Sequence, residues 1–183
     1  MGPADWARAC VEAYVRRSPL PRPPGEAVYA RRSACFVSLK SGGELRGCIG
    51  TLTPAEPDLG AEIARNARAA AFNDPRFTPV RPDELADLSV SVDVLSPSEP
   101  CEPFELDPRR YGVIVAHGVR RGVLLPDLPG VGSADVQIAI ALQKAGIAPD
   151  ADFGIERFTV VRYHEGEPAR AAGDDDMPPA THA

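Results

Sequence analysis

Several common sequence features are missing from this chain of 183 residues. No run approaches the roughly 20 apolar residues that a membrane-spanning helix needs, and the first residues, MGPADWARAC, lack the basic start and apolar core of a signal peptide. A Walker loop, a dinucleotide fingerprint and a Ser-His-Asp spacing are also missing. We therefore expect a soluble, cytoplasmic protein with no cofactor and no membrane contact.

Cysteine and histidine are scarce. The chain has four cysteines without a C-x-x-C pair and three histidines without a ligand spacing, so neither a disulfide framework nor a zinc site has support. We expect no metal and four free thiols, at Cys10, Cys35, Cys48 and Cys101. All of them except Cys48 lack a polar setting and are expected to be structural.

A surplus of basic charge is missing as well. The formal net charge is -6, and residues 165–183 hold five acidic residues against Arg170. The rest of the chain is therefore nearly neutral, which argues against an electrostatic nucleic-acid surface. The Gly, Pro and Ala content of this acidic segment predicts a disordered tail, which leaves residues 1–164 as a single domain.

The composition of the whole chain, 44% hydrophobic and 25% charged residues, is that of a globular domain. A first helix is expected over residues 3–17, and the prolines of residues 19–24 end it. Two strands, 33–39 and 44–50, flank a glycine turn and predict a hairpin, and a second hairpin turns near His117 and Gly118.

Two further helices and two further strands follow from the patterns. The helix within residues 53–73 begins at Pro54 or, because of Pro57, at Asp58, and a second helix begins at Ser133. The first of these has an apolar stripe at Leu59, Ile63, Ala67 and Ala70, with Glu62, Arg65 and Asn66 expected to lie away from it. Alternation predicts a half-buried strand over residues 88–96, and the last strand is expected over residues 156–165. Hairpins mixed with separate helices indicate an α+β fold with a largely antiparallel sheet and no internal repeat.

The stretch LRGCIG carries the main chemical candidate. Alternation along a strand places Cys48 on the same face as Arg46, with Leu45 and Ile49 on the core face. A guanidinium beside a thiol favours the thiolate, which is the nucleophile, and Gly47 and Gly50 would let a ligand approach the backbone. The other interpretation is that Cys48 packs as a small hydrophobe, which is how buried cysteine commonly behaves.

Partners for such a thiol are few. His117 is the best candidate for a general base, although its place in a hairpin turn also suits a solvated residue. In the stretch NDPRF, Asp74 and Arg76 can form a surface ion pair, or Arg76 can join Arg46 in binding a carboxylate or phosphate.

These stretches resemble the AMMECR family, named for the Alport syndrome, midface hypoplasia and elliptocytosis chromosomal region. The resemblance runs in order through LRGCIGTL, AAFNDPRFTPV and YGVIVAHGVRRGVLLP, over about residues 30–163. It implies an α+β fold with a smaller second lobe. The residues that carry over are Arg46, Gly47, Cys48, Gly50, Asp74, Arg76 and Phe77.

The resemblance also bears on function. Bacterial members are often called AmmeMemoRadiSam system protein A and are associated with a Memo-like partner and a radical-SAM protein. We therefore expect a small-molecule enzyme in which Cys48 acts as nucleophile or acid/base on a small anionic or carbonyl substrate, beside Arg46. The alternative is a non-catalytic binding or adapter module for a Memo-like or radical-SAM protein, in which Cys48 only packs.

Overall fold

The computed structural model describes residues 1–173, which form two compact units. The first unit comprises Met1–Leu95 with Arg162–Ala169, and the second comprises Ser96–Val161 with the segment from Arg170. Both contain antiparallel strands and separate helices, so the predicted α+β fold is confirmed. The second unit corresponds to the expected smaller lobe.

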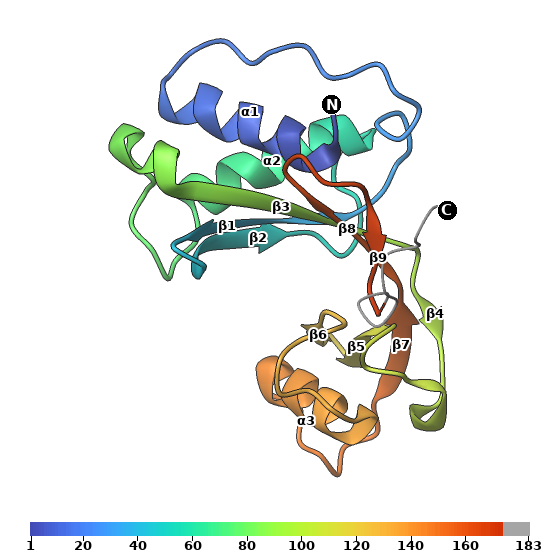
Figure 1. Ribbon diagram of the computed structural model, residues 1–183. Coiled ribbons are helices and arrows are strands. Elements are labelled where there is room, and N and C mark those ends of the chain that lie inside the picture. The colour runs from blue at the N-terminus through green and yellow to red at the C-terminus, as the bar shows by residue number, and fades with distance from the viewer. Residues whose placement is uncertain (174–183) are drawn as a thin grey trace, which may run out of the picture. The chain divides into compact units, whose positions relative to one another are not determined.

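The first unit holds two helices against a mainly antiparallel sheet (Figure 1). The sheet order is β2-β1-β3-β8-β9, so β2 lies at an edge. The unit contains α1 (Pro3–Val15), β1 (Cys35–Ser41), β2 (Glu44–Gly50), α2 (Leu59–Phe72), the 3-10 helix η1 (Pro82–Asp87) and β3 (Leu88–Leu95). The sheet continues into β8 (Val160–His164), which begins in the second unit and ends in the first, and into β9 (Arg170–Ala171), which belongs to the second unit.

Burial follows the alternation of the strands and the apolar stripes of the helices. Val37, Leu39 and Val92 are fully buried on the sheet face that contacts α2, and Trp6 and Ile63 reach them from the two helices. This sheet face and the helices therefore enclose one apolar core. The opposite sheet face, which carries Ser38, Cys48 and Ser91, is called the distal face below.

Helix α2 begins later than its earliest predicted start. The Asp58 carboxylate accepts a hydrogen bond from the Ala61 N–H at 2.8 Å and caps the helix, so the later of the two starts is correct. The expectation that Glu62 and Asn66 lie away from the buried stripe is wrong, because both are fully buried. Glu62 accepts hydrogen bonds from Thr51 and from two N–H groups of the preceding loop, which satisfies its carboxylate.

The first hairpin has the predicted glycine turn. Gly42 and Gly43 both have positive φ angles, 59° and 85°, which glycine adopts without strain. The register shifts between Leu39 and Lys40, and this irregularity precedes the turn. Leu45 lies across from it and is 40% exposed, so its predicted place on the core face is wrong.

Like the first unit, the second unit combines antiparallel strands with a helix, and it has fewer helices among the described residues. Its strand order is β4-β7-β5-β6, and Ser133 caps its one α-helix among the described residues. The predicted last strand is in fact two strands that separate at Thr159 and belong to different sheets. The elements are β4 (Glu99–Pro100), the 3-10 helix η2 (Pro103–Glu105), β5 (Gly112–His117), β6 (Arg120–Leu124), α3 (Ala134–Ala145) and β7 (Gly154–Phe158).

The disordered tail was predicted to begin at residue 165, which is too early. The Glu165 carboxylate accepts a hydrogen bond from the Val90 N–H at 2.7 Å, and residues 170–171 form β9, so residues 165–173 include ordered contacts. Residues 174–183 of the predicted tail lie outside the described residues. No helix within residues 1–173 is both long and apolar enough to cross a bilayer.

Candidate active site around Cys48

Cys48 lies in the edge strand β2 and is partly exposed on the distal face. Ser38 is its partner across the β1–β2 ladder, and Ser91 is the partner of Ser38 on β3, so the three side chains form a polar row. The Ser38 hydroxyl donates a hydrogen bond to the Cys48 sulfur over 3.2 Å. This bond fixes the direction of the sulfur on the distal face.

The loop after α2 closes on the backbone of Cys48. The Cys48 N–H donates to Asp74 Oδ2 at 2.9 Å, and Arg76 Nη2 donates to the Cys48 carbonyl oxygen at 3.3 Å. One carboxylate and one guanidinium thus take the place of a neighbouring strand at the edge of the sheet. The structure therefore brings together Cys48 of the stretch LRGCIG and Asp74 and Arg76 of the stretch NDPRF.

Asp74 is the electrostatic centre of this loop. Its side chain is buried, and it accepts two side-chain hydrogen bonds from Arg76, from Nε at 3.0 Å and from Nη2 at 2.7 Å. These bonds, followed by the Cys48 N–H, hold the pKa of Asp74 well below its ordinary value and raise the pKa of Arg76. The pair is therefore a partly buried charge pair and not the weak surface pair that the sequence also allowed.

Arg76 keeps part of its charge accessible. Its side chain is 55% exposed while its partner Asp74 is 2% exposed. Its guanidinium lies over the Phe77 ring at 5.5 Å from the ring centre, which holds it beside the strand. An exposed, positioned guanidinium of this kind can bind a carboxylate or a carbonyl oxygen.

The guanidinium of Arg46 is bound by Glu84. Its Nε and Nη2 donate to the two carboxylate oxygens of Glu84 at 2.8 and 3.2 Å, and this contact lowers the pKa of Glu84. The same guanidinium also lies 5.9 Å from the centre of the Phe77 ring. A role for Arg46 beside the thiol stays a prediction, whereas the Arg76 guanidinium contacts the backbone carbonyl of Cys48.

The two glycines of LRGCIG have packing roles. A Cβ atom on Gly47 would clash with the Ala70 carbonyl oxygen, so this glycine lets the backbone of α2 come close to β2. A Cβ atom on Gly50 would clash with the Phe36 ring, which covers it on the distal face. The space predicted for a ligand at these positions is therefore already filled by the protein.

His117 lies in the second unit, at the end of β5. Its ring Nδ1 contacts the Asp152 carbonyl oxygen at 2.5 Å, and the side chain is exposed. His117 and Cys48 therefore belong to different units, and the role of His117 as a base stays a prediction.

Two of the remaining cysteines, Cys10 and Cys35, differ from Cys48 in burial, whereas Cys101 is partly exposed as Cys48 is. Cys10 and Cys35 are fully buried, and burial raises the pKa of each thiol to about 12. Burial also raises the pKa of Cys101, which lies near Arg157 and several glutamates. Within residues 1–173, no group of three or more His, Cys, Asp and Glu side chains is placed to hold a metal ion.

Sequence reasoning missed two residues of this site. Ser38 could not be found by pairing the predicted hairpin strands, because a regular ladder from the turn at residues 42–43 would set Ser38 opposite Gly47, and the irregularity after Leu39 sets it opposite Cys48. Glu84 had no local signal, since it comes from a 3-10 helix that precedes the next strand.

Comparisons with known proteins agree with this structure. A protein of Thermotoga maritima is 52% identical over 164 residues, which cover 86% of this chain and 94% of that protein. A protein of Methanothermobacter thermautotrophicus is 37% identical over 87% of this chain and 90% of its own length. A protein of Clostridium acetobutylicum is 52% identical over 130 residues, but the matched part is only 28% of its length.

The solved structures and the family models point the same way. The crystal structure of the uncharacterized protein PH0010 from Pyrococcus horikoshii matches 92% of this chain and 94% of its own, with a TM-score of 0.82 and 30% identity. The model of the AMMECR1 family matches residues 4–166, which span parts of both units. The chain therefore belongs to the AMMECR1 family.

Proposed function

We propose that this protein is a thiol-dependent enzyme that acts on a small molecule through Cys48. The observation that carries the proposal is the setting of its sulfur, which is partly exposed and accepts a hydrogen bond from the Ser38 hydroxyl. The backbone of the same residue is held by Asp74 and Arg76, so the thiol is fixed in place. Cysteines 10 and 35 have no such exposure.

The chemistry follows from what surrounds the sulfur. The thiol gives up its proton to solvent and its sulfur adds to a carbonyl carbon of the substrate. The electron pair of the carbonyl π bond moves to the carbonyl oxygen, and Arg76 binds that oxygen or a carboxylate of the substrate. Asp74 holds Arg76 in position through two hydrogen bonds. Arg46 contributes through Glu84 and Phe77, which shape the edge of the site.

A screen of small carbonyl and carboxylate compounds tests the proposal. Consumption of each compound by the purified protein is followed by NMR, with Cys48→Ser and Ser38→Ala run beside the native sequence. We expect one compound class to be consumed by the native protein, more slowly by Ser38→Ala and not by Cys48→Ser. Equal consumption by Cys48→Ser, with its fold confirmed by circular dichroism, would contradict a role for the thiol in chemistry.

A second candidate is a non-catalytic adapter for a Memo-like or radical-SAM protein. It is favoured by the complete use of the Cys48 backbone in structural bonds and by the longer Clostridium relative, in which the matched region is one part of a larger protein. In that case Cys48→Ala weakens a complex with such a partner in pull-down titrations, and no compound is turned over.

A further inference from the structure

A cavity of about 480 Å³ lies within the second unit, along one side of α3. Its apolar lining includes Ile138 and Leu142 from the helix, Ile147 from the loop after it, Phe153 just before β7 and Ile155 within β7. Pro103, in η2, also lines it, and the next residue in the sequence, Phe104, is 86% exposed. Contiguous exposed apolar surface of this kind marks a candidate binding site.

The two units share one order of elements, which explains why the groove is there. Each has a hairpin, then a helix, then a strand that pairs antiparallel with the first hairpin strand. In each, the second hairpin strand carries a glycine under a helix carbonyl, Gly47 under Ala70 and Gly122 under Ala141. The helix N-caps follow at the same interval, from residue 47 to 58 and from residue 122 to 133.

Counting from these N-caps relates the groove to a filled position in the first unit. The α3 residues that line the groove, 135, 138, 139, 142 and 143, correspond to residues 60, 63, 64, 67 and 68 of α2. On α2 this side is covered by α1: Trp6 Nε1 donates to the Gly60 carbonyl oxygen at 3.0 Å, and the Arg68 guanidinium lies 5.9 Å from the centre of the Tyr14 ring.

The second unit lacks that covering helix within the described residues. There, α3 packs against β5, β6 and the single turn η2, and Ala139 and Val136 are left exposed. The groove thus corresponds to the position on the helix that α1 covers in the first unit, where the occupant is an α-helix.

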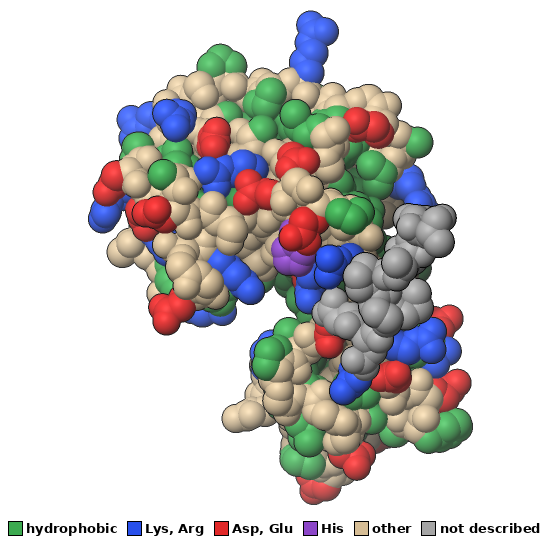
Figure 2. Space-filling model, viewed as in Figure 1, with side chains coloured by type: hydrophobic (Ala, Val, Ile, Leu, Met, Phe, Trp, Pro, Cys, Tyr) green, Lys and Arg blue, Asp and Glu red, His purple; other side chains and the backbone are tan. Residues whose placement is uncertain are grey.

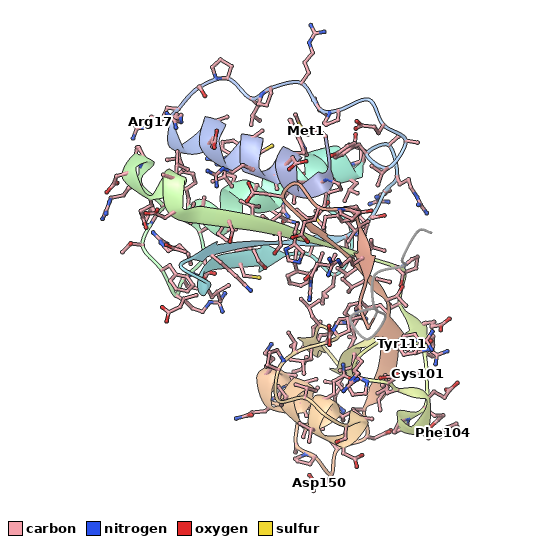
Figure 3. The ribbon with its side chains drawn as sticks, in the orientation of Figure 1. Met1, Arg17, Cys101, Phe104, Tyr111 and Asp150 are labelled. Atoms are coloured by element: carbon pink, nitrogen blue, oxygen red, sulfur yellow. The ribbon has the colours of Figure 1, made fainter. Side chains whose placement is uncertain are left out.

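The charge around the groove selects the kind of helix. Asp135 lines it, and Glu102, Asp150 and Asp152 flank the lining residues and are exposed; Figure 3 labels Asp150 in the loop after α3 and Phe104 on η2. In Figure 2 acidic side chains lie beside apolar ones at the lower end of this unit. Two basic side chains of this unit are oriented by backbone oxygens: Lys144 Nζ donates to the Val123 carbonyl oxygen, and Arg120 Nη1 donates to that of Gly146.

We propose that the groove along α3 binds an amphipathic helix of a partner protein, with its apolar face against Ile138 and Leu142 and lysine or arginine residues at its flanks. The apolar contact supplies affinity, and the acidic rim supplies orientation and faster association. This site is separate from Cys48, so its occupation does not depend on the proposed enzyme activity.

A designed peptide tests the proposal on the full chain. The probe is a fluorescein-labelled, amidated helix of 18 residues with Leu and Trp on one face and Lys on its flanks, and binding is followed by fluorescence anisotropy. Two peptides serve as controls: a scramble of the same composition, which has no apolar face, and a version with Glu in place of Lys. We expect the Lys helix to bind at least tenfold more tightly than either.

Substitutions then locate the site. Ala139→Arg places a long charged chain in the groove from an exposed position, so we expect at least tenfold weaker binding; Val119→Arg, which adds the same charge at a fully exposed turn, is the matched control. Backbone amide NMR shifts should change around Ile138, Leu142 and Ile147.

Three results would overturn the proposal. Equal binding of the Lys helix and its scramble would mean charge attraction alone, and equal binding to Ala139→Arg and Val119→Arg would place the site elsewhere. Binding of a small apolar dye that none of the peptides displaces would identify a pocket for small molecules and not for a helix.

Discussion

In the first unit, residues 46–48 of the second hairpin strand read Arg-Gly-Cys, and in the second unit residues 121–123 of the equivalent strand read Arg-Gly-Val. The glycine has the same task in both, because it lets a helix carbonyl come close to the strand. The residue after it points away from that helix in both units. In the first unit it is a thiol, and in the second it is a hydrocarbon side chain.

The rows across the two sheets differ in the same way. Cys48 lines up with Ser38 and Ser91, whereas Val123 lines up with Ile114 and Glu156. Ile114 is buried, so at least this position of the row serves packing. One order of elements thus supports a thiol between two hydroxyl-bearing residues in one unit, and two hydrocarbon side chains beside a carboxylate in the other, so the site depends on side chains added to a shared scaffold.

The largest expected effect comes from breaking the feature that both units share. Gly47→Val and Gly122→Val each place side-chain atoms against a helix carbonyl, so we expect each to destabilise the protein by about 3 kcal/mol or more, or to prevent folding. Thermal unfolding measures this. Gly132→Val is the matched control, since its added atoms meet open space; an unfolding temperature for Gly47→Val equal to that of the control would contradict the shared role.

The next effect tests the feature that only the first unit has. Asp74→Asn removes the buried charge that holds Arg76 and the Cys48 N–H, and we expect a loss of about 2 kcal/mol in the free energy of unfolding, measured by urea denaturation at pH 7. Asp83→Asn, at an exposed ion pair, is the control and should change little.

The same variant makes a pH prediction. Because the folded state lowers the pKa of Asp74, its stabilisation is fully present above the unfolded pKa of about 3.9 and is lost as the pH falls through the folded value. The stability difference between the native protein and Asp74→Asn should therefore be constant above about pH 5 and shrink below about pH 4. A difference that grows on acidification would show that another group is responsible.

Much of the scaffold could be predicted from the sequence, because local chemistry determines it. Three features depend only on residues close to them in the sequence. They are the glycine turn at residues 42–43, the Ser133 cap and the alternation of residues 88–95. The split at Thr159 could not be predicted, since residues 156–165 read as one strand and give no sign that the two halves join different sheets. The repeat was missed because the two units share little beyond an Arg-Gly pair and an interval.

The site could be predicted only in outline. Cys48, Asp74 and Arg76 were candidates from the sequence, and the structure places them in contact. The partner of Arg46 was not predictable, because Glu84 is 38 residues away in the sequence and its position depends on the course of the loop after α2. The prediction for Glu62 was wrong because a carboxylate is normally exposed. This one is buried, and three hydrogen bonds from the loop at residues 51–56 compensate for its loss of water.

The smallest effect on stability comes from exchanging the residues that distinguish the units. Cys48→Val gives the first unit the residue of the second, and we expect a change below about 1 kcal/mol because the side chain is only partly buried. The reciprocal Val123→Cys places a thiol next to Ile114, without a hydroxyl donor. It should be alkylated more slowly than Cys48; an equal rate would mean that the serine row gives no advantage.

The most direct test of a reactive Cys48 is alkylation of the folded native protein with iodoacetamide from pH 5 to 9, with each cysteine followed by peptide mass spectrometry. We predict that Cys48 is modified first at every pH, and that Cys10 and Cys35, whose thiols have a pKa of about 12, stay unmodified until the protein unfolds. If Cys48 instead stays unmodified in the folded protein, it is a packing residue and the proposed thiol chemistry is wrong.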